Sequence, residues 1–348
     1  MPQGMTINFV GLGLGSKDYL TRAAEEALLE SEKVYLDMYT GHISSELIDY
    51  LRDLLKDRLI FAERTTIENN LYKIIDEASR NKIAIATSGD PFIATTHIAI
   101  LLEAVKRGIC VKVIHGVSII SAAASYSGLS AYKFGRIVTV PRAASMEIME
   151  GIYRVIANNQ EHGLHTLVLL DTADGGVTAQ EAAEYLSRIE EKLGWGLFRD
   201  DRIAVVLLHV GMRTASKKCY AIKDLKELSL PPPPHVMILP GELNFVEKES
   251  LKMIAYCDYK MIDNHHPIST SRQRAKKYID KTQGVLGKIR KEPVDLEAQE
   301  VVELASTYVY DSQSFLLSGR TEDSLIAISY AEGLLDCLRM LGKVSFKW

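Results

Sequence analysis

Cysteine is scarce in this chain of 348 residues, with only four, at positions 110, 219, 257 and 337. No two of them form a C-x-x-C pair, so the spacing of a zinc or redox motif is absent and a reducing compartment is favoured. The chain also lacks an excess of positive charge, because it has 41 Lys and Arg residues and 45 Asp and Glu residues, for a net charge of -4. Nucleic acid is therefore not an expected partner, since its phosphates bind clustered cations.

Long apolar runs are absent as well. The N-terminus has no charged stretch followed by an apolar one, so no secretory signal is expected. No uncharged apolar run reaches the roughly 18 residues that would indicate a membrane span. The remaining composition, 47% hydrophobic and 25% charged residues, is typical of a globular protein. We expect a cytoplasmic protein of about two or three domains.

Strand and helix patterns alternate over the first two thirds of the chain. This alternation predicts βαβ units with mostly parallel sheets, arranged as two α/β lobes over residues 1–116 and 117–258. Helices are expected at 21–29, 43–55, 67–79, 95–106 and 146–159, and a capping box at Thr178 and Glu181 predicts another. Strands are expected at residues 7–12, 33–37, 82–87, 111–114, 136–140, 166–170, 203–209 and 236–239.

Strand patterns disappear after about residue 258. The segments 271–290, 294–317 and 322–341 have helical periodicity, with Ser318-Gly319 as a break and Gly342 as a stop. A separate three-helix module is therefore predicted over residues 268–348. The apolar stripe of its last helix, Leu325, Ile328, Ala331 and Leu335, is expected to pack within the module.

A glycine-rich segment, GLGLGS at residues 11–16, follows the first predicted strand. One interpretation is a dinucleotide site in which Asp37, at the end of the second strand, binds the ribose. That pattern needs a third glycine at position 16, where the chain has Ser16, so an NAD-dependent dehydrogenase ranks last among the candidate functions. A tight turn between strand and helix explains the glycines equally well.

Three further segments place polar residues where ligands bind in α/β sheets. In SGDPFIATTH, residues 88–97, Asp90 either accepts a bond from a ligand or caps its own turn. In HGVSIISA, residues 115–122, Ser118 either faces a ligand or caps a helix. The prolines at 231–234 stiffen the chain before His235, which is either a ligand contact or a structural residue. Cys257, His265 and His266 lack a fourth ligand and match no zinc spacing, so no metal is expected.

Seven segments, taken in order, resemble the diphthine synthases, which are S-adenosylmethionine-dependent methyltransferases of the tetrapyrrole-methylase type. They are INFVGLGLG, VYLDMYTG, SGDPFIATTH, VIHGVSIISA, YKFG, GLHTLVLLD and PPPPHVMILPG, and they extend from Met5 to about Tyr256. The SGDP-like loop is shared with the wider superfamily. The ATTH, YKFG and GLHTL segments and the proline-histidine segment are more specific to the diphthine synthases.

The resemblance implies two α/β lobes with the cofactor in the cleft between them, and a homodimer. It implies methylation of the amino group of a modified histidine on translation elongation factor 2, with S-adenosylhomocysteine as the second product. No catalytic residue is assigned, and residues 16–19 and 171–178 depart from the family pattern, so the acceptor contacts stay open. The implied cofactor contacts are Leu14, Asp90, Ile93, Ser118, Ile119, Leu170, Val210 and His235.

The end of the chain, ISYAEGLLDCLRMLG, is similar to a small uncharacterised helical domain found in archaea. This resemblance implies an archaeal source and a natural fusion, without a function for the tail. Two alternatives to the diphthine activity remain open. One is a sister methylase that acts on a tetrapyrrole carbon, and the other is a scaffold without turnover that presents the helical tail to a partner.

Overall fold

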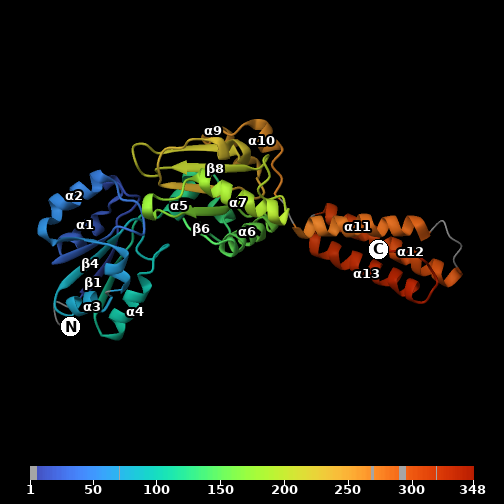
Figure 1. Ribbon diagram of the computed structural model, residues 1–348, viewed down its shortest axis with the longest axis horizontal. Coiled ribbons are helices and arrows are strands. Elements are labelled where there is room, and N and C mark those ends of the chain that lie inside the picture. Colours follow the sequence, from blue (N-terminus) through green and yellow to red (C-terminus); the bar gives the residue numbers. More distant parts are fainter. Residues whose placement is uncertain (1–5, 70, 268–269, 290–294, 319) are drawn as a thin grey trace. The chain divides into compact units, whose positions relative to one another are not determined.

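A computed structural model describes residues 6–69, 71–267, 270–289, 295–318 and 320–348 (Figure 1). The chain divides into two compact units. The first comprises most of the chain up to His266, and the second comprises Pro267–Trp348 with the short stretches 160–162 and 195–197. Within the described ranges, none of the helices combines the length and the apolar character needed to cross a membrane.

The first sheet of the larger unit is parallel throughout, as the sequence predicts. Its strand order is β3-β2-β4-β1-β5. The strand β3 was not predicted, because its four residues are mostly half-buried and show no alternation. The strands are β1 (Thr6–Gly11), β2 (Lys33–Asp37), β3 (Leu59–Ala62), β4 (Lys82–Thr87) and β5 (Cys110–Ile114).

Helices cover both faces of this sheet, because alternate strand residues point to opposite sides. Ile83 and Ile85 of β4 pack with α3 (Leu71–Ala78) and α4 (Ile98–Lys106). Ala84 and Ala86 pack with α1 (Arg22–Leu29) and α2 (Ser45–Leu55) on the other side. The predicted helix over 67–79 is in fact a π-helical turn, η3 (Thr65–Asn69), followed by α3, and the helix predicted from residue 95 begins at Ile98.

The second sheet is mixed, so the prediction of mostly parallel strands is wrong here. Strand β10 lies antiparallel between β7 and β8, and β9 pairs antiparallel with β8. Only β6 and β7 are parallel neighbours. Residue patterns detect a strand but not its direction, and β9 was missed because its residues are largely polar. The strands are β6 (Val138–Val140), β7 (Thr166–Leu170), β8 (Ile203–Leu208), β9 (Ser216–Ala221) and β10 (His235–Leu239), in the order β6-β7-β10-β8-β9.

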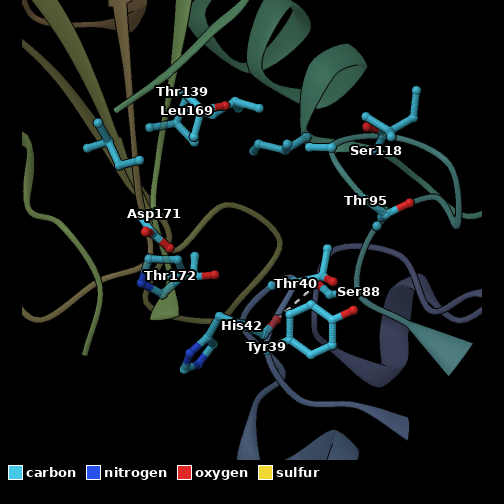
Figure 2. Close-up of a pocket in the computed structure, with 18 of the residues that line it drawn as sticks. Tyr39, Thr40, His42, Ser88, Thr95, Ser118, Thr139, Leu169, Asp171 and Thr172 are labelled. Atoms are coloured by element: carbon cyan, nitrogen blue, oxygen red, sulfur yellow. Dashed lines mark hydrogen bonds between the residues drawn. The ribbon is translucent and has the colours of Figure 1, made fainter. Parts of the chain in front are cut away.

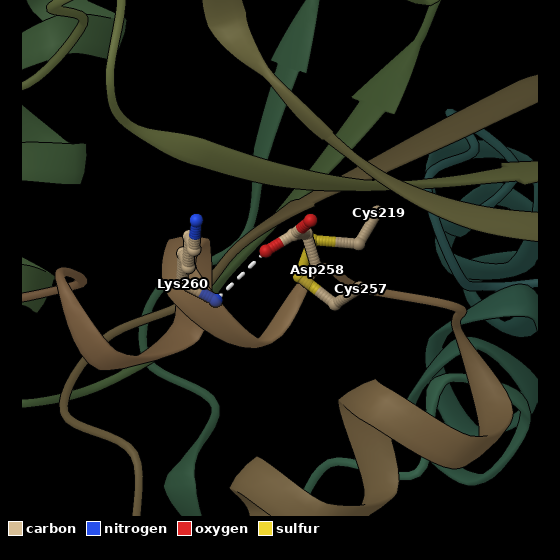
Figure 3. Close-up of a disulfide and its surroundings, with 4 residues drawn as sticks. All are labelled: Cys219, Cys257, Asp258 and Lys260. Atoms are coloured by element: carbon tan, nitrogen blue, oxygen red, sulfur yellow. Dashed lines mark hydrogen bonds between the residues drawn. A yellow bond between two sulfur atoms is a disulfide. The ribbon is translucent and has the colours of Figure 1, made fainter.

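The second sheet is flanked by helices that include the one predicted from a capping box. Thr178 and Glu181 make both reciprocal bonds at the start of α7. Two buried cysteines, Cys219 of β9 and Cys257 after α9, form a disulfide (Figure 3). Their separation of 38 residues hid this pairing from the sequence analysis, and it removes Cys257 from the metal-ligand cluster considered there. The helices are α5 (Ile119–Ser127), α6 (Met146–Glu161), α7 (Ala179–Leu193), α8 (Ile222–Glu227), α9 (Phe245–Ile254) and α10 (Tyr259–Asp263).

The described residues of the smaller unit form three helices, α11 (Thr270–Ile289), α12 (Leu296–Leu317) and α13 (Thr321–Met340). Its apolar core includes Ile328, Ala331 and Leu335, so three of the four residues in the stripe predicted for the last helix pack within the module, and Leu325 is only half-buried. The predicted boundaries at residues 268, 290 and 294 and the glycine of the predicted break at 318–319 lie outside the described residues. Two sheets, each with its own flanking helices, are followed by a helical module, and this arrangement confirms the predicted fold class.

Candidate functional site

A cavity of about 510 Å³ lies in the larger unit and is lined from both sheets (Figure 2). One side is formed by the segments that follow the five strands β1 to β5 of the first sheet. The other side is formed by the carboxyl ends of β6, β7 and β8 and by the first residues of β10. Because β10 runs antiparallel to its neighbours, its amino end lies at the same edge as their carboxyl ends. Ligands of α/β proteins bind at such edges.

Glycines bring three of the lining loops into direct contact. A Cβ added to Gly11 would lie 2.5 Å from the Gly116 nitrogen, and one added to Gly116 would lie 2.2 Å from the Gly89 oxygen. Gly13 and Gly89 exchange two backbone hydrogen bonds, at 3.2 and 2.6 Å. The segment GLGLGS therefore packs loops against each other, and a dinucleotide turn is not its role.

Asp37 contradicts the dinucleotide interpretation, because it is fully buried and does not line the cavity. Its carboxylate lies 3.1 Å from His97 Nε2 and accepts hydrogen bonds from Thr87 and from Thr40. Burial raises the pKa of Asp37, but the adjacent His97 ring and the hydrogen bonds from Thr40 and Tyr39 outweigh this effect and hold that pKa below its ordinary value. This network fixes the loop after β2 to the loop after β4, and both line the cavity.

Asp90 has the turn-capping role that the sequence left open, and it lines the cavity as well. Its carboxylate accepts a hydrogen bond from the Phe92 backbone at 3.1 Å and lies 2.7 Å from His115 Nδ1. The carboxylate thereby joins the loops after β4 and β5. Ser118 likewise caps α5, by accepting a bond from the Ile120 nitrogen at 3.2 Å, while it lines the cavity.

His235 has both ring nitrogens engaged by the protein backbone. Its Nδ1 accepts a hydrogen bond from the Ala179 nitrogen at 3.1 Å, and its Nε2 donates to the Pro231 oxygen at 2.8 Å. Burial lowers the pKa of His235, so the ring is neutral at neutral pH. The structural interpretation of this histidine is thus supported, and a ligand would meet the face of the ring or the backbone.

All eight residues that the sequence analysis assigned to the cofactor line this one cavity. Their role in binding stays a prediction. Sequence reasoning missed a further set of polar lining residues, most of which directly follow strand ends and could have been found by that rule. The eight are Leu14, Asp90, Ile93, Ser118, Ile119, Leu170, Val210 and His235, and the missed residues include Tyr39, Thr40, His42, Arg64, Glu68, Thr96, Asp171 and Thr172.

The lining of the cavity combines apolar surface with polar side chains, which suits a nucleoside with an amino-acid tail. Leu14, Ile93, Ile119 and Val210 provide apolar surface for a flat base. Gly89 leaves open space beside Asp90, because a Cβ there would meet no heavy atom within 4 Å. Among the described residues, no group of three or more His, Cys, Asp or Glu is placed to hold a metal ion.

Comparison with known proteins gives consistent results. The tetrapyrrole (corrin/porphyrin) methylases match residues 6–218, and a protein family of unknown function, DUF357, matches residues 277–344. A diphthine synthase of Methanosphaera stadtmanae is 37% identical over 257 residues, covering 73% of this chain and 97% of that protein. One of Staphylothermus marinus is 38% identical over 252 residues, covering 71% and 92%.

A crystal structure of diphthine synthase superposes with a TM-score of 0.67 and 31% identity, covering 74% of this chain and 99% of that one. These similarities confirm the resemblance, the fold and the class of enzyme expected from the sequence. The chain belongs to the diphthine synthase family of the tetrapyrrole methylases.

Proposed function

We propose that this protein transfers methyl groups from S-adenosylmethionine to the amino group of a modified histidine on translation elongation factor 2, in diphthamide biosynthesis. The observation that carries the proposal is the convergence of all eight expected cofactor contacts on one cavity, in a chain 37% identical to a diphthine synthase. The proposal assigns the cofactor to these eight residues and treats residues 1–116, 117–258 and 268–348 as the domains.

The chain's own contribution is positional. S-adenosylmethionine, when bound, supplies an already activated methyl group and leaves as S-adenosylhomocysteine. The loops after β1, β4 and β5, locked together by Gly11, Gly89 and Gly116, form a rigid wall that orients the ligand. Such alignment contributes on the order of 7–11 kcal/mol.

The acceptor amine must present a free lone pair before it reacts. If its pKa lies one or two units above neutral, the unprotonated form costs about 1.4–2.7 kcal/mol. This cost is small beside the contribution of alignment, so the proposal needs no strong general base and names no catalytic residue. The enzyme is further proposed to be a cytoplasmic homodimer of archaeal origin whose partner is the elongation factor, not nucleic acid or membrane.

Mass spectrometry of the elongation factor tests the proposal. The factor carrying the unmethylated modified histidine is incubated with the protein and S-adenosylmethionine, and the factor with an unmodified histidine is the control. Whole methyl increments on the one peptide that contains the modified histidine are expected, and the control should stay unchanged. No increment on either factor would refute the proposal.

Two further assays address the alternatives. Incubation with a tetrapyrrole precursor, followed by visible absorbance, detects the sister methylase activity. A pull-down with residues 268–348, together with an absence of radiolabelled methyl incorporation, would favour the scaffold. Neither result is expected if the protein acts on the elongation factor.

A further inference from the structure

A polar cluster lines the cavity and is not used by the expected cofactor contacts. It comprises Tyr39, Arg64, Glu68 and Thr96. Tyr39 follows β2, Arg64 and Glu68 follow β3, and Thr96 lies in the loop after β4. Three neighbouring strands of one sheet therefore deliver these side chains to the same edge.

Glu68 is the centre of the cluster. Its Oε2 accepts a hydrogen bond from Arg64 Nε at 3.0 Å, and its Oε1 accepts one from Thr96 Oγ1 at 3.0 Å. The guanidinium carbon of Arg64 lies 5.8 Å from the centre of the Tyr39 ring. The Tyr39 hydroxyl is buried and has no hydrogen-bond partner among the described side chains and backbone. Burial, with the charges of Asp37 and Glu68, raises the pKa of Tyr39, so the hydroxyl remains a donor.

The local backbone supports a functional role for this cluster. Glu68 lies on the π-helical turn η3, and such turns are frequent at functional sites. Ile67 of the same turn is fully buried in the core of the first sheet, which anchors the turn while Glu68 faces the cavity. An exposed ion pair contributes little to folding, so stability alone gives no reason for this arrangement.

The cluster presents one cation and one anion side by side, and each can take a further partner. The terminal nitrogens of Arg64 hydrogen-bond to nothing else that the structure describes. Each carboxylate oxygen of Glu68 accepts one bond and has a second lone pair free. Arg64 can therefore bind a carboxylate with its planar fork, while Glu68 accepts from an ammonium or amine.

We propose that Tyr39, Arg64, Glu68 and Thr96 form the acceptor subsite of the cavity, and that this subsite takes a zwitterionic group, an amine beside a carboxylate. The inference rests on the proposed function for the identity of the acceptor. It adds binding and orientation to that function and no covalent step. Arg64 and Glu68 are specificity residues in this proposal.

The molecule offers a matched control pair. Glu103 on α4 and Arg107, which caps the end of that helix, are also four residues apart, with Arg107 Nε 2.9 Å from Glu103 Oε1 and the guanidinium 5.3 Å from the Tyr72 ring. Arg107 also pairs with Asp76 at 2.7 Å. This pair does not line the cavity. Glu103→Gln and Arg107→Gln thus reproduce the chemical change of Glu68→Gln and Arg64→Gln away from the site.

Steady-state kinetics with the modified elongation factor tests the subsite first. Glu68→Gln and Arg64→Gln should each raise KM by at least about tenfold, because each variant loses a hydrogen bond between charged groups. The dissociation constant of S-adenosylhomocysteine should stay within about twofold, since its expected contacts lie elsewhere in the cavity. Arg64→Lys retains the charge but loses the planar guanidinium fork, so its KM should lie between that of the wild type and that of Arg64→Gln. If the cavity variants match the α4 variants in KM, the subsite is refuted while methylation by the wild type upholds the proposed function.

Binding of free alanine provides a readout that needs no turnover. The protein is saturated with S-adenosylhomocysteine and titrated with alanine in saturation-transfer NMR, with propionate and ethylamine as probes of one charge each. Alanine should bind the wild type more strongly than either probe, and Glu68→Gln and Arg64→Gln should abolish the preference. Retention of this preference in both variants would overturn the subsite. Preference in the wild type without methylation of the factor would uphold the subsite and reject the proposed function.

Discussion

Glu247 provides the sharpest test of the energetics of this fold. Its carboxylate is 2% exposed and accepts four hydrogen bonds, from Lys133 Nζ at 2.7 Å, His165 Nε2 at 2.9 Å, the Asn244 nitrogen at 3.0 Å and the Ser130 nitrogen at 3.1 Å. Burial raises the pKa of Glu247, but these donors outweigh it and lower that pKa to about 2 from an ordinary 4.5. The cluster joins the segments YKFG and GLHTL to the start of α9.

The change proposed is Glu247→Gln, which preserves shape and removes the charge. Each unit of pKa corresponds to about 1.4 kcal/mol, so the lowered pKa contributes about 3 kcal/mol to the free energy of unfolding at neutral pH. The unfolded chain binds the proton more readily, so this contribution is complete above the unfolded pKa of 4.5. It declines as the pH falls towards the folded value of about 2.

Urea unfolding followed by circular dichroism, at several pH values between 7 and 3, measures this contribution. At pH 7 the variant should be about 3 kcal/mol less stable than the wild type, and the two stabilities should converge in acid. Glu249→Gln, on the exposed side of the same helix, is the control and should change stability by less than about 0.5 kcal/mol. A difference below about 1 kcal/mol at pH 7, or one that does not depend on pH, would contradict this account of Glu247.

Three further predictions follow from single features of the larger unit. Asp90→Ala should weaken S-adenosylmethionine binding by about tenfold in calorimetry, because the carboxylate both joins two lining loops and faces the cavity, and an unchanged dissociation constant would be evidence against its role. Gly116→Ala should lower stability by about 1–3 kcal/mol in urea unfolding, since the new Cβ would lie 2.2 Å from a backbone oxygen. Gly151→Ala, with open space around it, is the control and should not destabilise. Reduction of the bond between Cys219 and Cys257 should lower Tm in scanning calorimetry, because the loop closed across 38 residues contributes up to about 4 kcal/mol, whereas a Tm unaffected by reductant would show that the cross-link does not stabilise the fold.

The first sheet was predictable because its sequence pattern is local. The β4 residues KIAIAT are apolar on both faces, as expected for a buried parallel strand, and both ends of that strand were predicted correctly. The short edge strand β3 has no such pattern and was not predicted. The turn that follows it, η3, was therefore not predicted either. Arg64 and Glu68 were therefore absent from the predicted site, although they follow a strand of the same sheet.

Long-range pairings were beyond the reach of the sequence alone. Thr178 and Glu181 lie three residues apart, so their capping box could be predicted from spacing. Glu247 meets His165 across 82 residues, and nothing local to either one indicates the contact. The disulfide is hidden for the same reason, because no pattern in the intervening chain shows that β9 and the end of α9 lie together.

The direction of β10 explains how His235 comes to line the cavity, although the topology of the second sheet was not predicted. In a purely parallel sheet, the residues just before a strand lie at the edge opposite the ligand, and His235 at the start of β10 would be far from Leu170 at the end of β7. Since β10 runs antiparallel between β7 and β8, its first residue pairs with Leu208 at the carboxyl end of β8. His235 thus reaches the cavity edge because of the same reversal that contradicted the parallel prediction, and a family pattern captured that position where strand periodicity could not.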